Sequence, residues 1–477
     1  MATISSAGVG SGLDVNSIIK QLMAIEQQPL KALQTKASTI QSTVSEYGKI
    51  KSTVSTLNDL AAQLAKATTW AQTSSASSNS AAVSVSTSGS APGSYSVEVQ
   101  SLASVQTLAT GMFASASALP GAGTLNIELG SWGTGQTSFT PKTGATSIDV
   151  TVSATDTLSD VRDKINAAGT GVTALIMNDA NGSRLLLRSA TTGAANAFRT
   201  TVSDVDGTPT DAAGLSQLAY GASAASKVMT QNQTAANAAA TINGLAVSST
   251  TNTLSNVVDG LTLTLAAVTT TPLSIDVTVN KDALTKTLTD FAAAYTAVVK
   301  LIATDTKYDP ASRKGGVLQG DNAAVGLQRQ LRSLVGTASG ASTMYGFMSD
   351  AGLQLQGDGS MTVNASKLDS ALANLGELRK AFSSSSAIDP TQDGFAKRFR
   401  VVTGAMLGIE GSLSTRADGM AKALTRNQRD QDTLNVRLTG IEARLRAQYT
   451  ALDATMAKLN SSSSYITQQL ASYTASR

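Results

Sequence analysis

Cysteine and histidine are both absent from the 477 residues of this sequence. Without cysteine no disulfide can form, and catalytic systems built on serine–histidine–aspartate or cysteine–histidine lack an essential group. Zinc sites made of histidine or cysteine are excluded for the same reason. Only carboxylate, lysine or tyrosine chemistry remains open, so we expect no enzyme activity, no bound metal and no cofactor.

Aromatic and charged residues are also scarce, at 4% and 14% of the chain, whereas hydrophobic residues make up 42%. The formal net charge is only +3 and is spread along the chain. Such a weak charge does not favour nucleic acid or an anionic membrane as a partner. No run of strongly apolar residues is long enough to cross a bilayer, so we expect no membrane insertion.

The length of the chain allows roughly three or four domains. Helical patterns occupy residues 13–64 and 282–473, while short strands joined by glycine, asparagine and aspartate occupy the stretch between them. We therefore predict an α+β multidomain fold. In this fold both termini form a helical, coiled-coil-like stalk, and β-rich head domains are inserted between its halves.

The first helix has a recognisable start and an interruption. Asp14 is placed to accept hydrogen bonds as the N-cap, and Leu13 and Ile18 can form a hydrophobic staple around it. Pro29 then interrupts the helix. Beyond it, one apolar row repeats every seven residues, which is typical of a coiled-coil seam. Its members are Leu33, Ile40, Tyr47 and Val54.

The carboxyl-terminal segment has a longer apolar row, unbroken through six heptads. Its members are Leu438, Leu445, Leu452, Leu459, Ile466 and Tyr473. The companion row is apolar at Leu434 and Ile441 but polar from Gln448 onward. Because a lone helix with such a face is marginal in water, we predict that these residues contact other helices.

The middle of the chain alternates apolar and polar residues, as half-buried strands do. Residues 158–168 predict one helix in this region, capped by Thr155 or Thr157. Three dipeptides predict turns with positive φ: Asn181-Gly182, Asn243-Gly244 and Asp259-Gly260. Residues 73–90 are rich in serine, alanine and threonine, and are either a linker or an exposed strand.

One acidic segment faintly matches a calcium-binding loop. Asp204, Asp206 and Asp211 lie around Gly207, but the closing bidentate glutamate of such loops is missing. We therefore interpret this segment as an exposed turn. The glycines at positions 8, 10 and 12 imitate a phosphate-binding loop, but no strand precedes them, and a flexible lead into the first helix is the better interpretation.

The two ends of the chain resemble a known family. Residues 10–15, including Gly12, Leu13, Asp14 and Val15, are similar to the amino-terminal signature of the flagellar filament cap family, also called hook-associated protein 2. Residues 241–265 resemble its middle block, and residues 442–470 resemble its carboxyl-terminal block. These blocks occur in the family's order and span nearly the whole chain. The resemblance is weakest at residues 103–152.

The sequence pattern and the resemblance together divide the chain into nested parts. They are terminal coiled-coil-like segments at 1–45 and 435–477, disordered until assembled; a helical leg at 46–70 and 282–434; a β-rich head at 71–108 and 233–281; and an inserted outermost head at 109–232. The apolar rows of both termini are then expected to contact neighbouring subunits or the filament.

The resemblance implies a homo-oligomeric ring at the distal end of the bacterial flagellar filament, where it promotes folding and insertion of flagellin and prevents its loss. Implied partners are further copies of the chain, flagellin, hook-filament junction proteins, the flagellar type III export apparatus and a cytoplasmic chaperone. The first twelve residues do not look like a cleaved secretory signal, which fits that export route to an extracellular position. Two alternatives remain: another axial or junction protein, and an adhesin whose heads bind host mucin or glycans.

Overall fold

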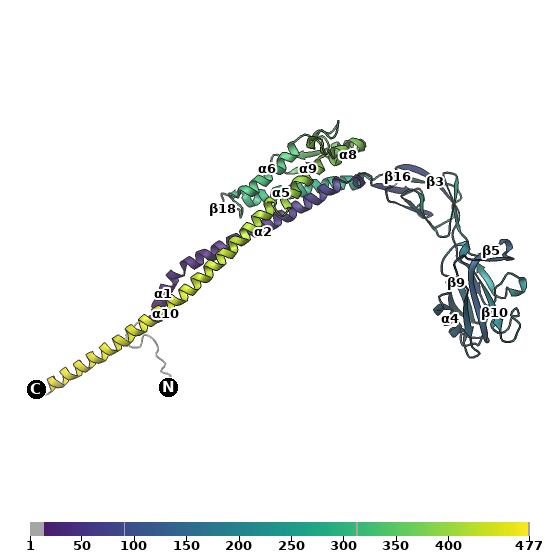
Figure 1. The fold of residues 1–477 in the computed structure, drawn as a ribbon, viewed down its shortest axis with the longest axis horizontal. Helices are drawn as coiled ribbons and strands as arrows, with labels where there is room; N and C mark the ends of the chain where they lie inside the picture. The colour runs from purple at the N-terminus through teal and green to yellow at the C-terminus, as the bar shows by residue number, and fades with distance from the viewer. Residues whose placement is uncertain (1–13, 90, 312, 476–477) are drawn as a thin grey trace. The chain divides into compact units, whose positions relative to one another are not determined.

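The structure is a computed structural model that describes residues 14–89, 91–311 and 313–475. The chain divides into two compact units. Met1–Trp70 and Lys281–Arg477 form a helical unit, and Ala71–Asn280 form a β-rich unit inserted between them (Figure 1). The predicted α+β fold, with β-rich domains nested between helical ends, is confirmed.

The amino-terminal part of the helical unit consists of α1 (Val15–Glu26) and α2 (Gln28–Leu64). The Asp14 carboxylate accepts a hydrogen bond of 3.0 Å from the Ser17 amide, so Asp14 is the N-cap as predicted. Pro29 lies in the first turn of α2, where a missing N–H costs nothing. Leu13, the other half of the predicted staple, lies outside the described residues.

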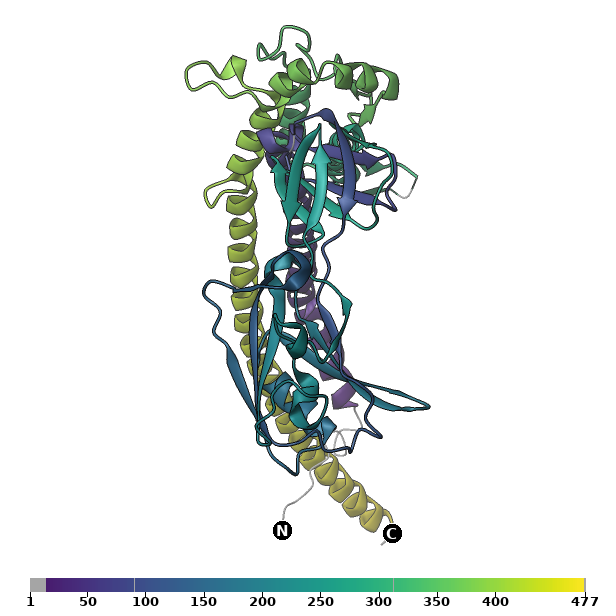
Figure 2. The ribbon, with the colours of Figure 1, turned by 90° about the vertical axis from the view of Figure 1, so that its right-hand side faces the viewer.

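The carboxyl-terminal helix α10 (Ser412–Ala475) runs antiparallel to α1 and α2 (Figures 1 and 2). Lys51 Nζ lies 3.4 Å from Ser414 Oγ near the start of α10. Farther along α10, Leu438 packs against Ile19 of α1. The two ends of the chain therefore form an intramolecular two-stranded helical seam.

The remaining helices build a compact core beside α2. They are α3 (Ala67–Trp70), α5 (Lys281–Thr306), α6 (Asn322–Gly336), α7 (Ala365–Ala373), α8 (Leu375–Ser383) and α9 (Phe395–Leu407). Two small hairpins accompany them: β17 (Tyr308–Asp309) with β18 (Lys314–Gly315), and β19 (Leu353–Leu355) with β20 (Met361–Val363). Buried aromatic rings join α5 and α9, with Phe291 and Phe399 5.1 Å apart edge to face.

The part of the β-rich unit nearest to the helical unit in sequence is called the inner lobe. One sheet has the order β1-β16-β3-β12-β13 and a second has the order β14-β15-β2. The strands are β1 (Thr73–Ser77), β2 (Val83–Thr87), β3 (Gly93–Ser101), β12 (Ala238–Ile242), β13 (Leu245–Ser249), β14 (Thr253–Val258), β15 (Leu261–Leu265) and β16 (Leu273–Val279). Residues 73–90 therefore contain two strands rather than a linker.

The outer lobe is the segment Thr107–Gln233, inserted between β3 and β12. Its first sheet has the order β10-β5-β6, with β7 also paired to β5, and its second has the order β11-β4-β9-β8. The strands are β4 (Thr107–Ala109), β5 (Gly123–Trp132), β6 (Phe139–Pro141), β7 (Ile148–Val152), β8 (Val172–Asp179), β9 (Gly182–Ser189), β10 (Ala197–Asp204) and β11 (Thr230–Gln233). Each lobe has its own hydrophobic core.

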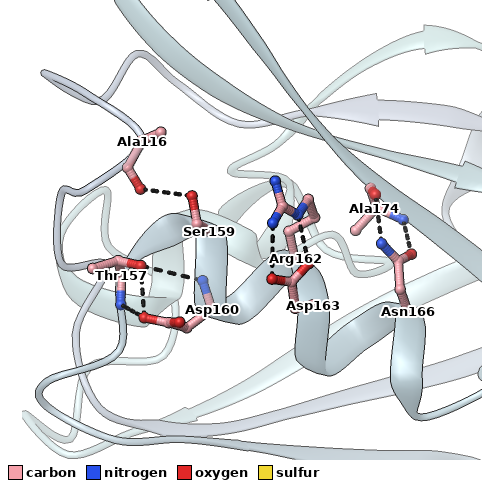
Figure 3. A network of polar contacts seen from close by, with 8 residues as sticks. All are labelled: Ala116, Thr157, Ser159, Asp160, Arg162, Asp163, Asn166 and Ala174. Carbon is pink, nitrogen blue, oxygen red and sulfur yellow. Dashed lines mark hydrogen bonds and ion pairs between the residues drawn. The ribbon is translucent and has the colours of Figure 1, made fainter.

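Helix α4 (Leu158–Ala167) is fixed to the outer lobe by side chains at both ends (Figure 3). Thr157 is its N-cap, and Thr157 and Asp160 form a reciprocal capping box. At the other end, Asn166 donates to Ala174 O at 2.9 Å and accepts from Ala174 N at 2.8 Å. The predicted helix is confirmed, and Thr157 rather than Thr155 caps it.

One of the three predicted turns has positive φ at both of its residues. Asn243 and Gly244, with φ of 51° and 82°, connect β12 to β13. The prediction at Asn181-Gly182 was wrong in register, because Asp179 pairs with Gly182 and the two loop residues are Ala180 and Asn181. The Asp179 carboxylate accepts from the Asn181 amide at 2.7 Å, so a side-chain turn replaces the expected backbone geometry. At 259–260 only Gly260 has positive φ.

Candidate assembly surfaces

The apolar row of α2 lies mostly inside the chain. Tyr47 and Val54 are buried, and Leu33 and Ile40 are half-buried. Helix α2 contacts α10 and also packs on α5 and α9. Tyr47 and Val54, which we predicted as contacts with other subunits or the filament, are therefore covered by the chain's own helices.

The first part of the α10 row is covered in the same way. Leu438 is buried by Val15, Ile19 and Met23 of α1. The half-buried side chains that surround this cluster are Leu30, Leu434, Ile441, Leu445 and Tyr449. Val15, part of the family motif, thus has a structural role in the seam between the two ends of the chain.

The second part of the α10 row is uncovered, and we call it the distal stripe. Its members Leu452, Leu459 and Ile466 are 44%, 59% and 57% exposed. Tyr473 lies on α10, but its side chain is outside the described part of the structure. From Leu452 to Ile466 the stripe extends about 21 Å, at about 1.5 Å per residue. The seam within the chain therefore ends near Tyr449, while the heptad pattern continues.

Two buried amides interrupt the apolar seam. Asn427 and Gln431 occupy positions seven residues before Leu434 and Leu438. Gln431 Nε2 donates to Asn427 Oδ1 at 2.6 Å, and Asn427 Nδ2 is buried without a partner among the described residues. Polar residues at seam positions fix register in coiled coils. The heptad rows predicted from sequence begin at Leu434 and Leu438 and do not include these amides, although the same spacing extended backward by seven residues reaches both.

A polar cluster joins three helices of the helical unit. Tyr47 Oη donates to Asp321 Oδ1 at 2.8 Å, and Arg416 Nη2 donates to Asp321 Oδ2 at 2.8 Å. Asp321 also caps α6 by accepting from the Ala323 and Ala324 amides. Desolvation and the Asp321 hydrogen bond raise the pKa of Tyr47 to about 12. Burial tends to raise the pKa of Asp321, but hydrogen bonds from Arg416 and Tyr47 outweigh it and lower that pKa.

The acidic segment of the outer lobe is a turn, as interpreted from sequence. Asp204 Oδ2 accepts from the Ser216 amide at 3.1 Å, and Asp206 Oδ1 accepts from the Thr208 amide at 2.8 Å. Among the described residues, no three histidine, cysteine or carboxylate side chains are grouped to hold a metal ion. In the same part of the chain, every helix is too short or too polar to cross a membrane. Gly12 and Leu13 lie outside the described residues.

Comparisons with known proteins match most of the chain. Family models match at 11–106 (flagellar hook-associated protein 2 N-terminus), 235–461 (flagellar hook-associated protein 2 C-terminus) and 137–191 (flagellin hook IN motif). The last match contains α4 and the β8–β9 hairpin.

Several named relatives match this chain over almost its full length and over almost their own full length. Flagellar hook-associated protein 2 of Escherichia coli K12 is 31% identical over 98% of each chain. The A-type flagellar hook-associated protein 2 of Pseudomonas aeruginosa is 30% identical over 98% of this chain and 97% of its own. A crystal structure of the D1-D2-D3 domains of the flagellar cap protein FliD from E. coli matches with a TM-score of 0.60 and 28% identity, covering 79% of this chain and 99% of that one. This chain belongs to the flagellar hook-associated protein 2 family.

Proposed function

We propose that this chain caps the distal end of the bacterial flagellar filament as a homo-oligomeric ring, where it promotes folding and insertion of exported flagellin and prevents its loss. Support comes from the relatives, which are named flagellar hook-associated protein 2 and flagellar cap protein. The proposed location is extracellular, at the flagellar tip, and the proposed role is structural rather than enzymatic.

The observation that carries this proposal is the distal stripe. Leu452, Leu459 and Ile466 continue a heptad whose earlier members are covered within the chain. Fully burying a leucine or isoleucine side chain stabilises by about 1.5–3 kcal/mol. The three side chains are 44–59% exposed, so covering them buries about half of that surface and releases roughly 2–5 kcal/mol before any cost of ordering. A partner helix from a neighbouring subunit or from the filament supplies that cover.

The polar residues beside the distal stripe favour a contact that can be broken and formed again repeatedly. The companion row is polar there, with Gln448, Thr455, Ser462 and Gln469. Polar contacts of this kind contribute only about 0.5–1.5 kcal/mol each. A cap that moves as each flagellin subunit is added needs many weak contacts, and a fully apolar two-row seam would hold too tightly.

The finer points of assembly are also proposals. We propose that the part of α10 beyond Tyr449, which the chain's own helices leave exposed, orders fully only when neighbours cover it, so that its folding is coupled to assembly. We further propose flagellin and the hook-filament junction proteins as partners, and export by the flagellar type III route with a cytoplasmic chaperone. Binding of host mucin or glycans by the β-rich unit remains a prediction from sequence.

The experiment replaces Leu459 and Ile466 with aspartate in the full chain, expressed in a motile strain that lacks its own copy. We expect loss of swimming and release of unpolymerised flagellin into the medium, because buried charges prevent the stripe from being covered. The matched control places two aspartates at Ser461 and Gln468, which have the same seven-residue spacing about 160° to 200° away around the helix.

The control variant should swim normally. Normal swimming and retained flagellin in the L459D/I466D strain would contradict the proposed role of the stripe. A motile, flagellin-retaining strain with no copy of the chain at all would contradict the capping function itself.

A further inference from the structure

The outer lobe carries charges that its own ion pairs leave unmatched. Arg162 pairs with Asp163 at 2.7 Å, Arg199 pairs with Glu128 at 2.6 Å, and Lys164 pairs with Asp156. Two further arginines, Arg184 and Arg188, have no ion pair or side-chain hydrogen bond in the part of the chain that the structure describes. Both are exposed and both lie on β9.

These arginines belong to one face of the β8–β9 hairpin. Met177 lies opposite Arg184, Leu175 opposite Leu186, and Thr173 opposite Arg188. Because alternate side chains point to opposite faces of a sheet, these residues share the face away from the lobe's core, where Leu185 and Leu187 are buried. We call Leu175, Met177, Arg184, Leu186 and Arg188 the basic hairpin face. Met177 is 57% exposed, so the two arginines flank an uncovered apolar patch on a hairpin whose strand β8 is a sheet edge.

The opposite charge is gathered at the end of β10 and in the loop that follows it. Asp204, Val205, Asp206 and Asp211 form what we call the acidic loop. No lysine or arginine occurs between Arg199 and Lys227, and none of the three aspartates has an ion pair among the described residues. Their Oδ atoms accept backbone amides of the same loop, which fixes its turns but leaves the charge unneutralised. Val205, at its centre, is 78% exposed.

The basic hairpin face and the acidic loop are complementary in their exposed apolar residues and in their charge. The hairpin face has an exposed apolar centre beside two arginines, with one acidic residue, Asp179, at its turn end. The acidic loop has an exposed valine among three aspartates, so the net charges of the two surfaces are opposite. Since they lie on the same chain without pairing there, each can be matched on another copy. A contact between two different surfaces of identical subunits is heterologous, and repetition of such a contact gives a ring when the rotation between neighbours closes and an open filament when it does not.

We propose that the basic hairpin face of one copy binds the acidic loop of the next copy, so that the outer lobes are joined head to tail around the ring. This inference rests on the proposed function, because it requires the homo-oligomer. Charges exposed at the rim of such a contact are screened by salt, with a Debye length of about 10 Å at 0.1 M. The contact therefore weakens as ionic strength rises.

The natural absence of cysteine allows a direct test with the full chain. Met177→Cys and Val205→Cys together place one thiol on each surface, and both positions are exposed. Mild oxidation of the assembled protein should give a ladder of disulfide-linked multimers on a non-reducing gel. Either single variant should give no product larger than a dimer, because its one thiol per copy allows only one bond.

Charge exchange then tests the specificity in the same double-cysteine background. Arg184→Asp with Arg188→Asp should reduce the cross-linked fraction at least tenfold, and so should Asp206→Arg with Asp211→Arg. Mixing these two variants should restore the ladder, because the acidic hairpin face of the first matches the basic loop of the second, and the unaltered hairpin face of the second matches the unaltered loop of the first. Lys142→Asp, an exposed charge change elsewhere in the lobe, should leave it unchanged.

Sedimentation of the same samples separates the two proposals. Rings that sediment normally while the cysteine pair gives no ladder, or gives only an internal disulfide, would overturn this contact and leave the capping function intact. A ladder that neither charge variant reduces would also overturn it. Protein that stays monomeric both in solution and on filament tips would contradict the ring itself.

Discussion

Replacing Asp321 with alanine removes a carboxylate on which three helices of the helical unit converge. Asp321 accepts hydrogen bonds from Tyr47 on α2 and Arg416 on α10, each at 2.8 Å, and caps α6. No single neighbouring residue can replace all three interactions. We expect this substitution to destabilise the packing of α2, α6 and α10 together.

The magnitude follows from the three losses. Removing an aspartate N-cap costs about 1 kcal/mol, and a buried Tyr47 hydroxyl that loses the acceptor of its proton costs about 1–3 kcal/mol. The ion pair with Arg416 adds at most about 1 kcal/mol, because that side chain is 48% exposed and solvent screens the pair. The expected total is about 3 kcal/mol. Tyr47→Phe, which removes only the hydroxyl, should cost about 1 kcal/mol.

The effect depends on pH in a defined direction. Hydrogen bonds from Arg416 and Tyr47 lower the pKa of Asp321 below its ordinary value of 3.8, although burial opposes them. A lowered pKa in the folded state stabilises the protein above the unfolded-state value, and this contribution is lost as pH falls through the folded value. The difference between wild type and Asp321→Ala should therefore be full at neutral pH and shrink below about pH 4.

Hydrogen exchange on the full chain is the suitable assay, because a chain with two units need not unfold in one step. Amides of α6 and of α2 around Tyr47 should lose protection in the variant. A change of less than about 0.5 kcal/mol in their opening free energy, which is ordinary for surface substitutions, would refute this reasoning. So would a loss that stays constant down to pH 3.

Three further substitutions test other features. Tyr295→Phe should be neutral or stabilising in thermal unfolding, because the buried Tyr295 hydroxyl has no partner among the described residues. Burial raises the pKa of Tyr295 to about 12, so this variant should also lose less stability than wild type between pH 10 and 12, where only the unfolded tyrosine ionises. Thr157→Ala should cost about 1 kcal/mol by removing the α4 capping box, measured by exchange of the α4 amides. Ser159→Ala, which removes a 3.3 Å hydrogen bond to Ala116 O but leaves the capping box intact, is the control and should cost less. Asn427→Leu with Gln431→Leu should raise the melting temperature of the helical unit, yet broaden the distance distribution between spin labels on α2 and α10, because the seam loses its register marker. An unchanged distribution would contradict that role.

Local patterns in the sequence were sufficient for much of the fold. Asp14, Pro29 and Thr157 mark helix starts through chemistry confined to a few neighbouring residues, and the structure has helices beginning there. The heptad rows identified the residues that lie along α2 and α10. The Asn243-Gly244 turn was predictable because positive φ at both positions strongly favours that pair.

Contacts between distant segments could not be predicted. Tyr47 and Asp321 are 274 residues apart in sequence, and nothing in either neighbourhood indicates their hydrogen bond. A heptad likewise identifies an apolar face without saying what covers it. Leu438 and Leu459 occupy the same row, but only Leu438 has α1 beside it. The Ala180-Asn181 loop was missed because strand register depends on the partner strand.

The β-rich unit begins and ends on paired neighbouring strands. Thr73 of β1 lies opposite Val279 of β16, and the Asn280 amide donates to Gln72 O at 2.9 Å. The polypeptide thus leaves the helical unit and returns to it through two adjacent strand ends that are hydrogen-bonded to each other. Because both connections meet at one pair of strands, we expect that the whole β-rich unit can be exchanged for another domain with the same two-strand base without changing the fold of the helical unit.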